Sequence, residues 1–301
     1  MATVDVEART PTEVADARVG VSILTYNRLD EVCRTVERML SLPEQPHIVV
    51  VDNGSTDGTP SVLRRRFPNV RCLSLDGNLG AAGRNAGVAA LTTPYVALCD
   101  DDTWWEPGSL RRAADLLDAY PRLAVLTGRV LVGPENRLDQ TCHEMATSPV
   151  RASCQLPGPA LVGFLAGASM VRRSAFLQVG GFERRFFIGG EEELLTLDLL
   201  SESWELSYVA DVVVHHHPSD VSRDTTRRRV TLMRNHLWVA WMRYPLPWTV
   251  TATVRALWLA RTEPSARAGV AEALRALPWA FKHRRVVPRD VQRRLRQVAH
   301  R

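Results

Sequence analysis

Three consecutive aspartates close the segment YVALCDDD, residues 95–102, directly after a mostly apolar run. Adjacent carboxylates repel one another, so a cluster at a partly buried position calls for a balancing positive charge. A run of three histidines, residues 215–217, ends a later β-rich segment. Carboxylate oxygens with one imidazole suit Mn²⁺ or Mg²⁺, and phosphate oxygens and water usually complete the coordination. The two clusters therefore predict a divalent cation that holds a diphosphate group.

The elements that must position these clusters alternate regularly up to residue 120. Strands are predicted for VGVSILTYN, HIVVVD, VRCLSLDG and YVALCD. Helices are predicted for LDEVCRTVERMLSL, PSVLRRRF, GAAGRNAGVAAL and SLRRAADLLDAY, the last with Ser109 as its N-cap. Strands that alternate with helices indicate an α/β protein with a mostly parallel sheet covered on both faces.

Polar clusters follow three of these strands. They are TYNR after the first strand, DNGSTDGT after the second and DDD after the fourth. In an open α/β sheet, ligands bind outside the carboxyl ends of the strands. A solvated turn would also explain adjacent aspartates, but their place at this edge favours a binding site.

The pattern becomes mixed after residue 120. Strands are predicted for LAVLTGRVLV, for the start of LAGASMVRRSAFLQVGGF and for WELSYVADVVV, while residues 142–164 are expected to be mostly loop. EEELLTLDLLSES is predicted to be a helix with acids at its N-terminal end, where the helix dipole favours them. From residue 226 onward the chain is expected to be helical and interrupted by prolines.

Composition limits the class of protein. Of the 301 residues, 45% are hydrophobic and 24% are charged, as in ordinary soluble proteins. No apolar run is long enough to span a membrane, and the N-terminus lacks the apolar core of a signal peptide. Five cysteines without paired spacing indicate reduced thiols, so a cytoplasmic location is expected.

Charge is distributed unevenly along the chain. Residues 1–220 hold 20 basic and 29 acidic residues, whereas residues 221–301 hold 18 basic and 4 acidic residues. The second part also holds five of the eight tryptophans. A break of this kind predicts two parts with different roles.

Seven segments, taken in order, resemble family-2 glycosyltransferases, which are inverting enzymes with the GT-A fold, and in particular bacterial rhamnosyltransferase-like members. The segments are VSILTYNR, VVVDNGSTDGT, NLGAAGRNAG, ALCDDD, GASMVRRSAFLQVGGFERRFF, GGEEELL and YVADVVVHHHPS. The resemblance covers residues 18–220 and implies a Rossmann-like central sheet flanked by helices. It implies a nucleotide-binding half at 18–105 and an acceptor and catalytic half at 106–220. A flexible segment, 1–17, and a basic, Trp-rich helical region, 221–301, are expected on either side.

The resemblance implies which residues bind the donor and the metal. Asp102 matches the direct metal ligand, and Asp100 faces the ribose or the metal-bound waters. One histidine is expected to join them. Counting along the motif favours His216, with His215 as the alternative, because neighbours on a strand point to opposite faces. The implied donor-binding residues are Thr25, Tyr26, Asn27, Arg28, Asp52, Asn78, Gly80, Arg84, Asp100 and Asp101.

The GGEEELL segment is implied to carry the catalytic base. The family usually has Glu-Asp after a glycine, and the second acid deprotonates the acceptor hydroxyl. By position this acid is Glu192, with Glu191 as its neighbour. This chain has glutamate where aspartate is usual, so Glu191 and Glu193 stay open as alternatives. The other interpretation is a set of helix-start acids that only satisfy the helix dipole.

The implied activity is inverting transfer of a hexosyl or deoxyhexosyl group from a nucleotide-diphosphate sugar, assisted by Mn²⁺ or Mg²⁺. UDP- or dTDP-linked donors are favoured over GDP-linked donors, and rhamnosyl transfer from a dTDP-linked donor leads. The implied acceptor is a hydroxyl of a cell-envelope glycan, a glycolipid or a secondary metabolite. The alternative is a non-catalytic nucleotide-sugar or glycan-binding protein of the same fold. A nucleotidyltransferase is disfavoured because TYNRLDE lacks a Gly-rich loop.

Two Trp-containing features keep two interpretations each. Residues 221–301 could contact an anionic membrane at the inner face of the plasma membrane, or could pack their apolar faces against the rest of the chain. Nucleic-acid binding is not expected, because no recognised motif accompanies the charge. Trp104 and Trp105 could line the sugar or acceptor site, or could be packing residues.

Overall fold

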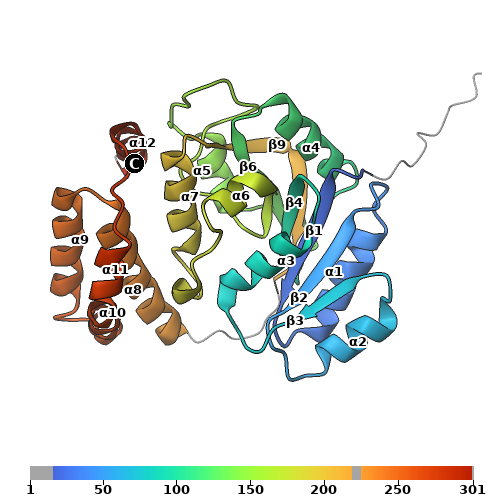
Figure 1. Ribbon diagram of the computed structural model, residues 1–301, viewed down its shortest axis with the longest axis horizontal. Coiled ribbons are helices and arrows are strands. Elements are labelled where there is room, and N and C mark those ends of the chain that lie inside the picture. Colours follow the sequence, from blue (N-terminus) through green and yellow to red (C-terminus); the bar gives the residue numbers. More distant parts are fainter. Residues whose placement is uncertain (1–15, 219–224, 300–301) are drawn as a thin grey trace, which may run out of the picture.

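The computed structural model describes residues 16–218 and 225–299. The expected flexible segment 1–17 lies almost wholly outside these ranges, and so does the boundary near residue 220. Figure 1 shows a sheet with helices around it and, beside α7, a cluster of helices formed by the C-terminal part. No helix among the described residues is both long and apolar enough to cross a membrane.

The first half of the sheet is parallel, as predicted. Within the described ranges the sheet has nine strands in the order β3-β2-β1-β4-β8-β6-β9-β5, and β7 pairs with β6. The carboxyl ends of the first four parallel strands meet at one edge. These strands are β1 (Val19–Thr25), β2 (His47–Asp52), β3 (Arg71–Ser74) and β4 (Tyr95–Asp100).

The second half of the sheet is mixed, which corrects the expectation of a mostly parallel sheet. β8 runs antiparallel to both β4 and β6, and β5 runs antiparallel to β9, whereas β6 and β9 are parallel. Strand and helix no longer alternate here, so the right-handed crossovers that keep strands parallel are missing. The strands are β5 (Thr103–Trp105), β6 (Leu123–Val132), β7 (Arg137–Leu138), β8 (Ala168–Arg172) and β9 (Glu205–His216).

The helices expected from the apolar spacing form, with two differences. A short helix, α5, lies in the expected loop, where the Asp139 side chain caps it by accepting a hydrogen bond from the Thr141 amide. Ser109 is not the N-cap of α4. Gly108 precedes the helix at φ 86°, and the Ser109 hydroxyl accepts from the Val213 amide of β9. The elements are α1 (Leu29–Leu40), α2 (Thr59–Arg66), η1 (Gly80–Gly83), α3 (Arg84–Ala90), α4 (Ser109–Ala119), α5 (Gln140–Ala146), α6 (Arg173–Gln178), η2 (Arg184–Phe186) and α7 (Glu191–Ser201).

The C-terminal part is helical, as predicted, and packs on the rest of the chain. Trp238 and Trp241 are buried, and the Trp238 ring meets the Phe186 ring edge-on at 5.6 Å. Packing therefore accounts for these two tryptophans. Trp258, by contrast, is 67% exposed. The helices are α8 (Thr225–Arg243), α9 (Leu246–Leu259), α10 (Pro264–Arg275), α11 (Leu277–Lys282) and α12 (Arg289–Ala299).

A buried ion pair attaches α12 to the sheet. The Arg294 guanidinium donates to both carboxylate oxygens of Glu205, at 2.8 and 2.9 Å, where β9 begins. Burial alone would raise the pKa of Glu205, but hydrogen bonds from Arg294 and Ser153 outweigh it and lower the pKa. The carboxylate is therefore stable in the interior only while its partners remain.

Replacing Arg294 by Met is expected to destabilise the protein by about 3–5 kcal/mol, because a charged carboxylate then stays buried without its partner. Urea denaturation followed by circular dichroism measures this effect. The matched control is Arg293→Met, at an exposed neighbour, with an expected change within about 0.5 kcal/mol. The loss should shrink at acidic pH, where protonation of Glu205 removes the buried charge. Equal losses in the two variants would contradict this account of how α12 is attached.

Candidate active site

The loops that follow β1 and β2 are joined by Asn27. Its backbone amide donates to the Ser55 hydroxyl at 2.8 Å, and its side-chain oxygen accepts from the Thr56 amide at 2.7 Å. Asn27 adopts φ 52°, a conformation that asparagine tolerates better than most residues. Tyr26 beside it is 41% exposed at the rim. Asn27 therefore shapes the edge of the site, and Tyr26 is the side chain left open to a ligand.

Asp52 ends β2 with one free oxygen. The residue is buried, and its Oδ2 accepts from the Ser55 amide at 3.2 Å. Its Oδ1 is buried and has no hydrogen-bond partner among the described residues. A buried carboxylate oxygen without a partner is costly unless a ligand supplies a donor. Asp52 Oδ1 is therefore available to accept a hydrogen bond from a ligand.

Asn78 and Gly80 shape the loop before α3. The Asn78 side-chain oxygen accepts from the Asn53 side chain at 3.0 Å and from the Gly80 amide at 2.8 Å. Gly80 has φ 60°, and a Cβ there would clash with the carbonyl oxygen of Phe187. That carbonyl accepts from the Ala81 amide at 2.7 Å. The donor-side loop thus lies directly against the segment that leads to the glutamates.

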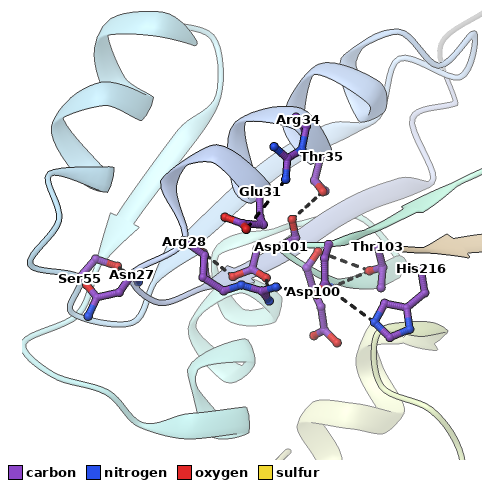
Figure 2. Close-up of polar contacts among 12 residues, drawn as sticks. Asn27, Arg28, Glu31, Arg34, Thr35, Ser55, Asp100, Asp101, Thr103 and His216 are labelled. Carbon is purple, nitrogen blue, oxygen red and sulfur yellow. Dashed lines mark hydrogen bonds and ion pairs between the residues drawn. The ribbon is translucent and has the colours of Figure 1, made fainter. Parts of the chain in front are cut away.

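Arg28 balances the aspartate cluster. Its two terminal nitrogens lie 2.5 Å from Asp101 Oδ1 and 2.9 Å from Asp102 Oδ2, and Figure 2 shows it reaching toward Asp101. The other Asp101 oxygen accepts from the Thr25 hydroxyl at 3.0 Å. Burial raises the pKa of Asp101 to about 7, although the Arg28 charge opposes the rise. Arg28 thus binds the aspartates here rather than facing open space.

His216, and not His215, faces the aspartates. In the antiparallel pairing of β5 with β9, Thr103 lies opposite His216 and Trp104 opposite His215. His216 Nε2 lies 3.6 Å from Asp102 Oδ1. His215 points away, where its Nδ1 contacts Asn136 Oδ1 at 3.1 Å and its ring stacks on Trp104 at 5.6 Å. The alternation predicted for a strand therefore places His216 beside Asp102 and His215 on the other face.

Asp102 Oδ1 and His216 Nε2 are placed so that both could reach one cation. Among residues 16–218 and 225–299, no group of three His, Cys, Asp or Glu side chains is arranged to hold a metal ion. An ion bound here would therefore complete its coordination with phosphate oxygens and water, as Mg²⁺ and Mn²⁺ commonly do. The donor set fits a metal that arrives together with a diphosphate.

The two tryptophans after the aspartates are engaged in packing. Trp105 is fully buried. Trp104 lies between the His215 ring and the Arg38 guanidinium, which sits 3.7 Å above the centre of the indole. Their surroundings favour the packing interpretation over a sugar platform.

Arg84 connects the aspartates to the glutamates. It is buried and forms an ion pair with Asp100, whose other oxygen lies so close to Gly167 that a Cβ there would clash. The Arg84 charge also lowers the pKa of Glu191 and of Glu192, against the larger effect of their burial. One guanidinium therefore acts on both Asp100 and the two glutamates.

Two of the three glutamates face this arginine. Glu192 Oε1 accepts from the Ala166 amide at 2.8 Å, and burial, with help from the Glu191 charge, raises the pKa of Glu192 to about 7. Glu191 is buried, its pKa is raised by burial, and its Oε2 has no partner within the described ranges. Glu193 points away and accepts from the Tyr244 hydroxyl. Glu193 is therefore engaged by Tyr244 and does not share the surroundings of Glu191 and Glu192.

The conformation of the loop before these glutamates is held by α8. The sequence alone did not predict this contact. Phe187, Gly189 and Gly190 adopt positive φ values of 66°, 81° and 87°. Asn235 of α8 is buried, and its amide nitrogen lies 2.5–3.1 Å from the carbonyl oxygens of Phe186, Ile188 and Gly189. Nothing in the spacing of the motifs marks an asparagine so far along the chain. Asn235 therefore supports the catalytic segment from outside it.

Solved structures share this architecture. A mannosyltransferase from Pyrobaculum calidifontis, in complex with GDP-Man and Mn²⁺, aligns with a TM-score of 0.57 at 20% identity, over 91% of this chain and 76% of that one. TarS from S. aureus, in complex with UDP-GlcNAc, aligns with a TM-score of 0.56 at 17% identity, over 85% and 71%. The expected GT-A fold is confirmed.

Sequence comparison agrees with the fold. The chain is 29% identical over 275 residues to the N-acetylglucosaminyl-diphospho-decaprenol L-rhamnosyltransferase of Mycobacterium tuberculosis, over 78% of this chain and 89% of that protein. The model of glycosyl transferase family 2 matches residues 21–180, more than half of the chain. The protein therefore belongs to glycosyl transferase family 2 and is a glycosyltransferase.

Proposed function

We propose that the protein transfers a sugar, with inversion, from a UDP- or dTDP-linked donor to a hydroxyl of a lipid-linked acceptor, assisted by Mn²⁺ or Mg²⁺. The observation that carries this proposal is the position of Glu192. Its carboxyl has a pKa of about 7. The charges of Arg84 and Asp100, which form an ion pair at the proposed donor side, both act on this pKa. A base near its own pKa at neutral pH, next to the leaving-group site, suits deprotonation of an alcohol.

The residues of this chain would divide the reaction as follows. The free Oδ1 of Asp52 would accept a hydrogen bond from the ring N–H of the uracil or thymine base. Asp102 and His216 would hold the cation, whose charge offsets that of the diphosphate when bound. Glu192 takes the proton of the acceptor hydroxyl. That oxygen bonds to the anomeric carbon from the face opposite the diphosphate, and the bond from this carbon to the leaving oxygen breaks.

The acceptor class rests on the relatives. The rhamnosyltransferase named above carries a lipid-linked acceptor in its name. Rhamnosyl transfer from dTDP-rhamnose is therefore the leading reaction. The alternative of a non-catalytic sugar-nucleotide or glycan-binding protein would not require an acid with a raised pKa beside the donor site.

Contact with the inner face of an anionic membrane is part of the proposal. One side of α9 presents an apolar stripe, defined by Leu246, Val250, Val254, Leu257 and Trp258, each 49–67% exposed. Exposed arginines, including Arg255 and Arg261, flank it. An exposed apolar helix face with cations around it suits the boundary of anionic headgroups.

The division of the chain also remains part of the proposal. It comprises a nucleotide-binding half at 18–105, an acceptor and catalytic half at 106–220, and the basic helical region at 221–301.

Donor recognition is tested by thermal shift with UDP, dTDP and GDP, each with and without Mn²⁺. We expect UDP or dTDP with Mn²⁺ to raise the melting temperature, since about 2.7 kcal/mol of stabilisation accompanies a ligand at 100 times its Kd. Asp102→Asn should remove the dependence on Mn²⁺. Asp211→Asn, on the exposed surface, serves as the control. Equal shifts with all three nucleotides would overturn the preference for UDP or dTDP, and no shift with any of them would overturn the use of a nucleotide-sugar donor.

The base is tested by Glu192→Gln. Transfer to an N-acetylglucosaminyl-diphospho-lipid should fall about 10²–10⁴-fold, because the amide cannot accept the proton, while the nucleotide shift persists. In the wild type, kcat should rise with pH and level off above about 7, where Glu192 is deprotonated. Glu202→Gln, at the exposed end of α7, should behave as the wild type. Near-normal turnover of Glu192→Gln would exclude this residue as the base.

Membrane contact is tested by co-sedimentation of the full chain with vesicles that contain an anionic lipid. Trp258→Glu, within the α9 stripe, should reduce the bound fraction several-fold, because it places a like charge against the headgroups. Leu177→Glu on α6, another exposed apolar position, is the matched control. If both variants bind vesicles as the wild type does, α9 does not contact the membrane.

A further inference from the structure

A groove runs along the seam between α8 and α9. It has a volume of about 720 Å³, and α12 contributes to one end. Its lining is mostly apolar and includes Met233, Trp248, Ala252 and Leu259, with His236 and two arginines among them. The volume and composition are those of a site for a small molecule rather than of a packing defect.

A second hollow continues this groove. It has a volume of about 410 Å³ and shares Met233 and His236 with the first. Its other lining residues include Arg229 and Leu232 of α8 and Glu263 in the turn before α10. The two hollows therefore form one trough along α8.

The near end of the trough reaches the loop that carries the glutamates. Leu232 is 43% exposed and packs so closely on Gly189 that a Cβ there would clash with its side chain. Phe187 and Ile188 of the same loop are 42% and 46% exposed. Glu191 and Glu192 follow Gly189 by two and three residues. The Leu232 end of the trough therefore lies beside the loop that leads to the proposed base.

The shape of the trough limits what could fill it. On α9 alone its lining extends from Trp248 to Leu259, which corresponds to about 17 Å at the rise of an α-helix. A sugar would find few polar partners over that length, whereas a hydrocarbon chain would bury the part of its surface that faces the apolar lining. Arg229, exposed at the end near the catalytic loop, suits the phosphate that joins such a chain to a sugar.

We propose that this trough binds the hydrocarbon chain of the lipid-linked acceptor. The sugar end then lies at Glu192, the phosphate lies near Arg229, and the chain follows α8 toward Trp248. This inference rests on the proposed acceptor class and adds the site that recognises it. It also gives α8 a second task beside the support of the catalytic loop by Asn235.

Binding of farnesyl diphosphate to the full chain provides the test, with excess inorganic diphosphate present to occupy sites that recognise phosphate alone. Equilibrium dialysis should show saturable binding that survives this competitor. Ala252→Trp, which fills the groove, should weaken binding at least tenfold. Ala271→Trp, exposed on α10, should leave it unchanged. If Ala252→Trp does not fold, Ala252→Gln places an amide in the groove and should weaken binding in the same direction.

Two results would overturn the inference. One is displacement of farnesyl diphosphate by inorganic diphosphate, and the other is unchanged binding in the Ala252 variants. The nucleotide thermal shift is measured on the same samples. A normal nucleotide shift without binding of farnesyl diphosphate refutes only the trough. Loss of the nucleotide shift in the wild type refutes the proposed function itself.

Discussion

Two arginines, the half-buried Arg28 and the buried Arg84, offset the charge of the acidic side chains in the site. Five carboxylates converge on one edge of the sheet, and such a group could not stay charged in the interior without compensation. Arg28 forms ion pairs with both Asp101 and Asp102. Arg84 forms an ion pair with Asp100, and its charge also acts on Glu192. The two guanidiniums leave the cluster short of positive charge. That deficit suits a site that receives a divalent cation, while burial, with help from the Glu191 charge, raises the pKa of Glu192.

The helices after residue 225 contact and support the loop that leads to α7. Asn235 fixes the carbonyls of the loop before α7, and Tyr244 turns Glu193 away from the cluster. Arg243 pairs with Asp198 farther along α7, with its Nη2 3.0 Å from the carboxylate. The loop itself adopts backbone conformations that cost energy outside glycine, as Phe187 does at φ 66°. Contacts from α8 therefore hold a conformation that the loop sequence alone would not favour.

The sequence was sufficient for the parts of this arrangement that local chemistry decides. Apolar runs marked the strands, and turn residues marked the loops after β1, β2 and β4. It favoured His216 over His215 by counting alone, whereas which of the two faces the aspartates depends on the register of β5 against β9. It could not find Asn235 or the partner of Glu193, since both contacts join residues more than 40 positions apart. The helix α5 was missed because its seven residues carry little periodic signal.

The geometry of Asp102 shows how these requirements fit together. Its two oxygens face different partners, Arg28 on one side and His216 on the other. A cation at the His216 side therefore does not have to displace the guanidinium that neutralises the cluster. Arg28 neutralises Asp102 Oδ2 in the folded protein, and the Oδ1 side beside His216 is where we propose that the cation binds. One carboxylate can therefore contact both charges, because its two oxygens face different partners.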